Sequence, residues 1–188
     1  MKITNLRQTD AERVHHAFLQ AAVARGERKK SGFFEYPLTE EDIRRRLEDP
    51  RLSLVLEEQG RLLGYAIAYP LSRISDIDKR KDPILQRLEG EEDVIYFDQL
   101  FIANNLPLYI AGRFIDSWTN LAFSQGVKGV VCAIPQKPWK NVSSTRIVLA
   151  RGFNRQNSVS EGDLELGVFA KPLWATDKDF PKYYHLGN

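Results

Sequence analysis

The segment VIYFDQLFI at residues 94–102, followed by ANNLP at 103–107 and LYIAGR at 108–113, decides the fold of this 188-residue chain. The first nine residues are apolar on both faces, which is typical of a central strand. The apolar residues that follow recur at helical spacing as far as Ala122, and Gly126 predicts the end of that helix. A helix that starts after a buried strand directs unpaired N–H groups and a positive dipole end toward an anion such as a pyrophosphate.

Further elements are predicted on both sides of this junction. Before it we expect a strand, two helices that follow the caps Thr9 and Thr39, and a hairpin that turns at Gln59 and Gly60. After it we expect a strand, a helix over residues 142–150, and a last strand. The expected strands cover residues 2–6, 52–57, 62–69, 94–102, 128–134 and 164–170.

The chain length and the order of elements predict one domain over residues 1–188. Its fold class is mixed α/β (α+β), with a central mixed, mostly antiparallel sheet flanked by helices. Residues 72–92 are mostly polar and predict a loop insertion with a short helix near residues 84–88, because the segment is too short to bury a core of its own. Residues 174–188 form the expected C-terminal tail.

This order of elements resembles the fold of the GNAT superfamily of acyl-CoA N-acyltransferases, over about residues 2–173. Three places carry the resemblance: YFDQLFI at 96–102, AGR at 111–113, and PWKNVSS at 138–144 followed by ARGF at 150–153. In that family the strand splays from its neighbour, and its free backbone groups pair with the pantetheine arm. The resemblance implies acetyl-CoA as cosubstrate, held by Leu100, Phe101, Ile102, Ala111, Gly112, Arg113, Asn141 and Ser144.

The chain departs from the family pattern at two places. The family's phosphate loop reads Q/R-x-x-G-x-G/A, and with Gly112 at its last position the two earlier positions hold Ile110 and Pro107. Neither keeps the chemistry, because proline lacks an N–H and only glycine lets the backbone come so close to phosphates. Many members also carry a tyrosine that protonates the departing thiolate, five positions before the Gly-Phe phenylalanine, where this chain has Val148.

Several of these candidates have a structural alternative. Arg113 meets either a phosphate or solvent. Asn141 and Ser144 either contact the pantetheine or cap the fourth helix, and capping is the commoner role. Only the backbone of Leu100 and Ile102 is expected to function, since their side chains belong to the core.

Amine acylation needs a group that takes a proton from the acceptor. Asp98 is the leading candidate, because an acid inside an apolar strand needs a reason. Its alternative is a structural residue at a bulge, paired with a backbone amide or an arginine. Glu35 is the second candidate, with ordinary solvent exposure as its alternative. The aromatic residues expected to border the acceptor site, unless they belong to the core, are Phe33, Phe34, Tyr36 and Tyr69.

Composition narrows the class of protein. The formal net charge is +2, from 27 basic and 25 acidic residues, which is too balanced for a dedicated nucleic-acid binder. The basic runs at residues 25–30 and 44–46 predict a solvated loop and a solvated helix face. Cys132 predicts a small buried residue, and the three histidines are not placed to bind a metal. No apolar run is long enough for a membrane span, so we expect a soluble, cytoplasmic protein without a membrane partner.

Two functions from different classes fit these observations. The first is an N-acetyltransferase that transfers the acetyl group directly to an amine of a small molecule or peptide. The second is a non-catalytic GNAT-like module that binds acyl-CoA or another protein. Trp174 and the aromatic residues of the tail are compatible with packing on a second copy in a homodimer.

Overall fold

The computed structural model describes residues 1–24, 38–78, 93–103, 106–138 and 140–173. Its strands are β1 (Lys2–Asn5), β2 (Leu54–Glu58), β3 (Arg61–Pro70), β4 (Val94–Ile102), β5 (Gly129–Lys137), β6 (Asn154–Glu161) and β7 (Leu164–Pro172). Its helices are α1 (Ala11–Ala24), α3 (Glu40–Arg46), α4 (Ile74–Asp78), α5 (Leu108–Ser124) and α6 (Val142–Ala150), with short 3-10 helices η1 (Gln8–Asp10), η2 (Pro50–Leu52) and η3 (Leu71–Arg73). Within the described ranges, no helix has both the length and the apolar character needed to cross a membrane.

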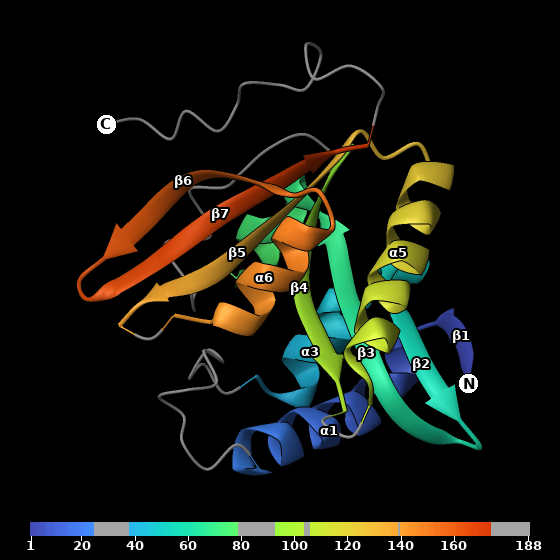
Figure 1. Ribbon diagram of the computed structural model, residues 1–188. Coiled ribbons are helices and arrows are strands. Elements are labelled where there is room, and N and C mark those ends of the chain that lie inside the picture. Colours follow the sequence, from blue (N-terminus) through green and yellow to red (C-terminus); the bar gives the residue numbers. More distant parts are fainter. Residues whose placement is uncertain (25–37, 79–92, 104–105, 139, 174–188) are drawn as a thin grey trace.

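The seven described strands form one sheet in the order β1-β2-β3-β4-β5-β7-β6 (Figure 1). Every neighbouring pair among them is antiparallel except β4 and β5, which run parallel and are connected through α5. The predicted mixed, mostly antiparallel sheet is therefore confirmed. The predicted strand over residues 94–102 is also confirmed, with the same two ends.

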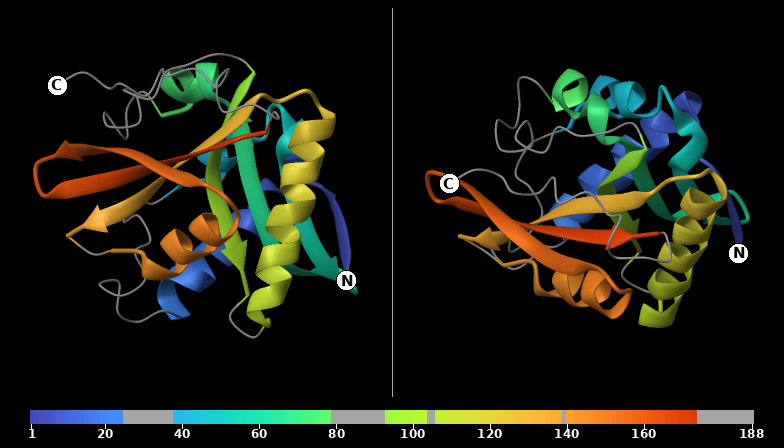
Figure 2. Two further views of the ribbon diagram at one scale, coloured as in Figure 1. Left: turned by 45° about the horizontal axis from the view of Figure 1, so that its top comes forward. Right: turned by 90° about the horizontal axis from the view of Figure 1, so that it is seen from above.

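Helices cover both faces of the sheet, and the sheet separates two apolar cores (Figure 2). On one face α1, α3 and α4 bury apolar side chains such as Val14 and Ile43 against β3 and β4. On the other face Trp118 of α5 packs on the ring of Phe97 with centroids 4.4 Å apart, and its Nε1–H donates to the carbonyl of Leu52 at 2.5 Å. The strands between the two cores are held on both sides, which gives the central sheet a rigid frame.

Local signals explain where α3 and the first hairpin begin and end. The Oγ1 of Thr39 accepts the N–H of Asp42 at 3.1 Å, and the Asp42 carboxylate accepts the N–H of Thr39 at 2.8 Å, so the predicted cap is confirmed. Gln59 and Gly60 have φ values of 52° and 78° and form the turn between β2 and β3. Two residues with positive φ match the twist of a tight hairpin, which confirms the predicted turn.

Two local predictions at the N-terminal half are wrong. Thr9 lies inside η1 and does not cap the first helix; instead the side chain of Asp10 accepts the N–H of Arg7 at 2.7 Å. The start of the segment predicted as a loop insertion forms η3 and α4, where Ile74 and Ile77 are buried in the core. The predicted helix near residues 84–88 lies outside the described residues.

The strand β6 was not predicted at all. Its sequence, NRQNSVSE, is polar and contributes only Val159 to the core among its described side chains. It forms because its backbone pairs with β7 in an antiparallel register. Polar side chains are typical of a strand at the edge of a sheet.

Candidate active site

The strands β4 and β5 pair over only a short part of their length. Within the described part of the chain, the parallel register covers Val94, Ile95 and Tyr96, opposite residues 129–131. Beyond this point the two strands diverge, and the remainder of β5 stays paired with β7 (Figure 1). Residues 97–102 therefore leave one edge of β4 without a strand partner in the described residues, and we call it the unpaired edge.

Two residues direct their backbone groups along the unpaired edge. The N–H of Ala103 donates to the carbonyl of Leu63 in β3 at 2.9 Å. Residues of an antiparallel strand alternate between bonding to the neighbour and facing away from it. Counting back from Ala103, Phe101 faces β3, whereas Leu100 and Ile102 direct their N–H and C=O groups away from β3. The two backbone ligands predicted from the sequence thus lie on the unpaired edge, and the Phe101 backbone does not.

Asp98 lies at a bulge in the same strand. The β3–β4 register passes from Ile67 opposite Gln99 to Ala68 opposite Phe97, so Asp98 is the extra residue of β4 between these two register pairs. Its Oδ2 accepts the Nε–H of Arg46 at 2.7 Å. This is the structural arrangement that the sequence left open for Asp98, and its role as a general base stays a prediction.

Arg46 was missed because it ends the basic run at residues 44–46, which was predicted to be a solvated helix face. That prediction is wrong for Arg46, whose side chain is only 4% exposed, against 10% for Asp98. The residue also donates through Nη1 to the carbonyl of Asp42 at 3.2 Å. The signal was present in the sequence, since Arg46 follows the buried Ile43 at a spacing of three and shares its helix face.

The tyrosine Tyr69 does not border an open site. It is wholly buried, and its ring lies 5.6 Å from that of Tyr96 in the core that α1 and α3 cover. Glu35, Phe33, Phe34 and Tyr36 lie outside the described residues, so the acceptor side of the site keeps its status as a prediction.

The start of α5 carries three of the predicted ligands. Ala111 and Gly112 are buried, and Arg113 is exposed. A Cβ atom added to Gly112 would lie 2.8 Å from Cζ and 3.3 Å from Nε of Arg151, and closer still to Nη2. The absence of a side chain at Gly112 therefore makes room for the guanidinium of Arg151, a residue that the sequence did not single out.

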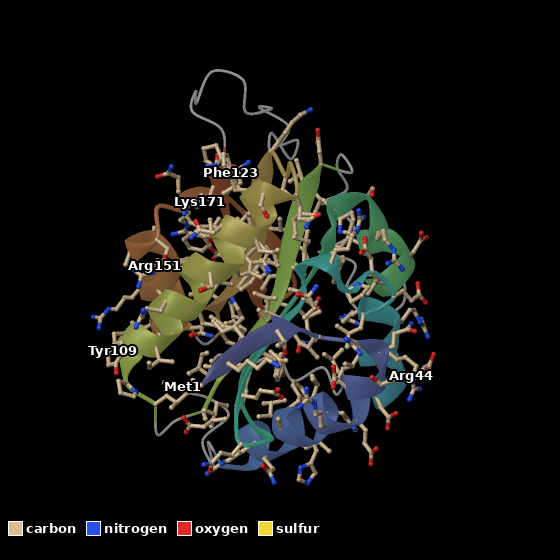
Figure 3. All side chains as sticks on the ribbon, turned by 90° about the vertical axis from the view of Figure 1, so that its right-hand side faces the viewer. Met1, Arg44, Tyr109, Phe123, Arg151 and Lys171 are labelled. Carbon is tan, nitrogen blue, oxygen red and sulfur yellow. The ribbon has the colours of Figure 1, made fainter. Side chains whose placement is uncertain are left out.

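Arg151 belongs to a small charged group beside α5. Its Nε lies 3.1 Å from the carboxylate of Asp116, and Figure 3 shows it between Tyr109 at the start of the helix and Phe123 near its end. Burial lowers the pKa of nearby Lys171, Asp116 opposes this effect, and the charge of Arg151 adds to it. Two cations thus lie near the helix that follows the unpaired edge.

The residues predicted at the start of α6 act as a helix cap. The Oδ1 of Asn141 accepts the N–H of Ser144 at 3.0 Å, and the carbonyl of Asn141 accepts the Thr145 hydroxyl at 2.8 Å. Val148, at the position where the resemblance leads one to expect a tyrosine, is buried. A valine side chain has no ionisable proton, so a general acid for the departing thiolate would have to be another group.

Cys132 is a buried residue, as the sequence predicts. It is buried in β5, and burial raises the pKa of its thiol to about 12. A thiol with that pKa stays protonated at neutral pH, and it is the thiolate that attacks. The described residues also hold no group of three His, Cys, Asp or Glu side chains that could bind a metal ion.

Comparison with known proteins identifies the fold. No family model and no curated protein matches the sequence. Among solved structures, a ribosomal-protein-alanine N-acetyltransferase from Brucella melitensis is 18% identical with a TM-score of 0.64, over 92% of this chain and 99% of its own. The structure of yncA from Salmonella typhimurium with its cofactor acetyl-CoA is 15% identical with a TM-score of 0.63, over 94% of this chain and 95% of its own.

A third similar structure is described as a member of the GNAT family. A GNAT-family acetyltransferase from Listeria monocytogenes is 12% identical with a TM-score of 0.65, over 91% of this chain and 94% of its own. At such low identities the likeness concerns the fold alone. The chain has the GNAT N-acetyltransferase fold, and the fold predicted from the sequence is confirmed.

Proposed function

We propose that this protein is an acyltransferase that transfers the acetyl group of acetyl-CoA to an amine of a small molecule or peptide. The unpaired edge of β4 carries this proposal. Leu100 and Ile102 direct backbone donors and acceptors away from β3, as a strand does when it accepts an extended partner. The pantetheine arm contains two amide groups on a narrow chain, so its chemistry fits such an edge.

The helix that follows supports the phosphate end of the same ligand. The N–H groups of Leu108 and Tyr109, in the first turn of α5, have no acceptor within the helix. The first hydrogen bond at this end is the one that the N–H of Ile110 donates to the carbonyl of Pro107. The 17 residues of α5 add a positive dipole at this end. The cations of Arg113 and Arg151, within the first turns of the helix and beside it, favour an anion there.

The chemistry places few demands on the protein. Acetyl-CoA supplies the acetyl group as a thioester. The acceptor nitrogen, as the free amine, forms a bond to the acyl carbon, the carbon–sulfur bond breaks, and the sulfur leaves as a thiolate that takes up the proton released by the new amide nitrogen. The N–H groups of Leu100 and Ile102 hold the arm and polarise the carbonyl. We propose Asp98 or Glu35 as the base that takes the proton of the ammonium.

A second function is favoured by the departures from the family pattern. Val148 supplies no acid, Pro107 supplies no N–H in the phosphate loop, and Arg46 engages the carboxylate of Asp98. These features suit a protein that binds acyl-CoA or a protein partner without catalysis. The solved structures that share the fold include one that holds acetyl-CoA, which is compatible with both functions.

Titration by calorimetry tests the ligand first, with acetyl-CoA, free CoA and desulfo-CoA. We expect micromolar binding of acetyl-CoA, and no binding up to millimolar concentration would refute the acetyl-CoA proposal. If the ligand binds, an acceptor screen follows with Asp98→Asn, and with Asp163→Asn in the β6–β7 turn as matched control. Binding without turnover of any acceptor amine would favour the non-catalytic module.

A further inference from the structure

We propose that the buried ion pair between Arg46 and Asp98 holds the bulge of β4 in place and so determines which backbone groups lie on the unpaired edge. Arg46 is then a positioning residue, since it acts through Asp98 and not on a substrate. The ligand in this inference rests on the proposed function, but the position of the bulge can be tested without any ligand.

On the N-terminal side of the bulge, the backbone of Phe97 faces β5. Its partner Ala68 bonds through both its N–H and its C=O to the Oγ of Ser53, each at 3.2 Å, so Ala68 faces away from β4. If this register continued without a bulge, alternation would turn Gln99 and Phe101 toward β5. A different set of backbone groups would then lie on the unpaired edge.

The extra residue Asp98 reverses this alternation. After Asp98, the backbone N–H and C=O groups of Leu100 and Ile102 point toward β5. Their side chains pack against the core under α5, where the side chain of Phe97 also lies. Phe101 packs against the opposite core. Because the strand has a period of two, one inserted residue exchanges both the backbone groups and the side-chain faces of every position that follows.

The ion pair gives the bulge a defined place. Buried charges that are well paired are seldom more stabilising than apolar residues of the same size, so stability alone does not account for Arg46 and Asp98. A bulge moved by one residue would leave the carboxylate and the guanidinium apart in the interior, which is strongly unfavourable. Arg46 itself is fixed, since it ends α3 and also bonds to the carbonyl of Asp42 at 3.2 Å.

The test measures the register by NMR and the affinity for acetyl-CoA by calorimetry. In the present register Leu100 and Ala66 form a pair without mutual hydrogen bonds, so their α protons are close enough for a cross-strand Overhauser effect. The variants are Arg46→Met combined with Asp98→Leu, which removes both charges while keeping apolar volume, and Asp98→Asn, whose amide oxygen can still accept from Arg46. The exposed Arg51→Met serves as control.

We expect the control and Asp98→Asn to keep the Leu100–Ala66 signal and the affinity for acetyl-CoA. The double variant should lose this signal, gain one between Gln99 and Ala66, and bind acetyl-CoA about tenfold or more weakly, as for the loss of two backbone hydrogen bonds. A double variant that keeps the Leu100–Ala66 signal overturns the inference. If the wild-type protein does not bind acetyl-CoA, the proposed function fails, and the register alone still decides this inference.

Discussion

The contact between Gly112 and Arg151 leads to a prediction about stability. The three atoms nearest to a Cβ at position 112 all belong to the guanidinium end of Arg151. Gly112→Ala therefore displaces Arg151, whose side chain is 31% exposed and can move toward solvent. The displaced ion pair with Asp116 is partly exposed and is worth about 0.2–1 kcal/mol. Alanine in place of glycine within a helix stabilises by about 1 kcal/mol.

These two effects nearly cancel in the single variant. We expect Gly112→Ala to leave the free energy of unfolding within about 0.5 kcal/mol of wild type. In an Arg151→Ala background there is no ion pair with Asp116 left to displace. Gly112→Ala should then stabilise the protein by about 1 kcal/mol, which raises Tm by about 2–4 °C for a chain of this size. Urea and thermal unfolding of the four proteins in this cycle measure both values.

A control and a refuting result complete the test. Gly126 has a φ of 76° with no atom within 4 Å of an added Cβ, so Gly126→Ala should destabilise with or without Arg151. If Gly112→Ala destabilised the Arg151→Ala protein by about 1 kcal/mol or more, room for Arg151 would not explain this glycine. If stability rises while affinity for acetyl-CoA falls, the space above Gly112 serves the ligand as well.

Three further predictions concern single side chains. Asn141→Ala removes the cap of α6 and should lower stability by about 1 kcal/mol, measured by urea unfolding against the exposed Asn154→Ala. Cys132, with a thiol pKa of about 12, should resist a thiol reagent at pH 8 until the protein is unfolded, and rapid labelling of the native protein would contradict its burial. Burial is the chief cause that lowers the pKa of Lys171 in the folded protein, so below that pKa its charge destabilises the fold. Lys171→Met should therefore raise Tm at pH 7, and this gain should shrink as the pH rises toward 10.5. A gain in Tm that grew with pH would contradict the lowered pKa.

Elements with strong local signals could be predicted well from the sequence. The strand over residues 94–102 has the same ends in the structure, because a segment that is apolar on both faces is stable as a central strand that is buried on both sides. The helix over residues 142–150 also has the same ends, since Asn141 caps it and Gly152 follows it with a φ of 80°. Capping and turn chemistry act between near neighbours in the chain, so they can be read locally.

Elements that depend on distant partners could not be predicted in the same way. The polar strand β6 has no apolar alternation of its own and forms through pairing with β7. The burial of Arg46 was obscured by the two arginines before it, which are exposed. The packing of Arg151 on Gly112 joins residues 39 positions apart in the sequence, and no pattern in either segment indicates it.

For the candidate site, the sequence by itself determined that a buried strand leads through a short loop into a helix, and that Asp98 and the backbone of Leu100 and Ile102 belong to that strand. Only the tertiary structure decided that β4 leaves β5 after three pairs, and that Asp98 forms a bulge paired with Arg46. The physical reason is that register and splay depend on contacts between strands and helices far apart in the chain; Arg46 lies 52 residues before Asp98. A period of two specifies which residues alternate, but the fold selects which of the two sets faces the unpaired edge.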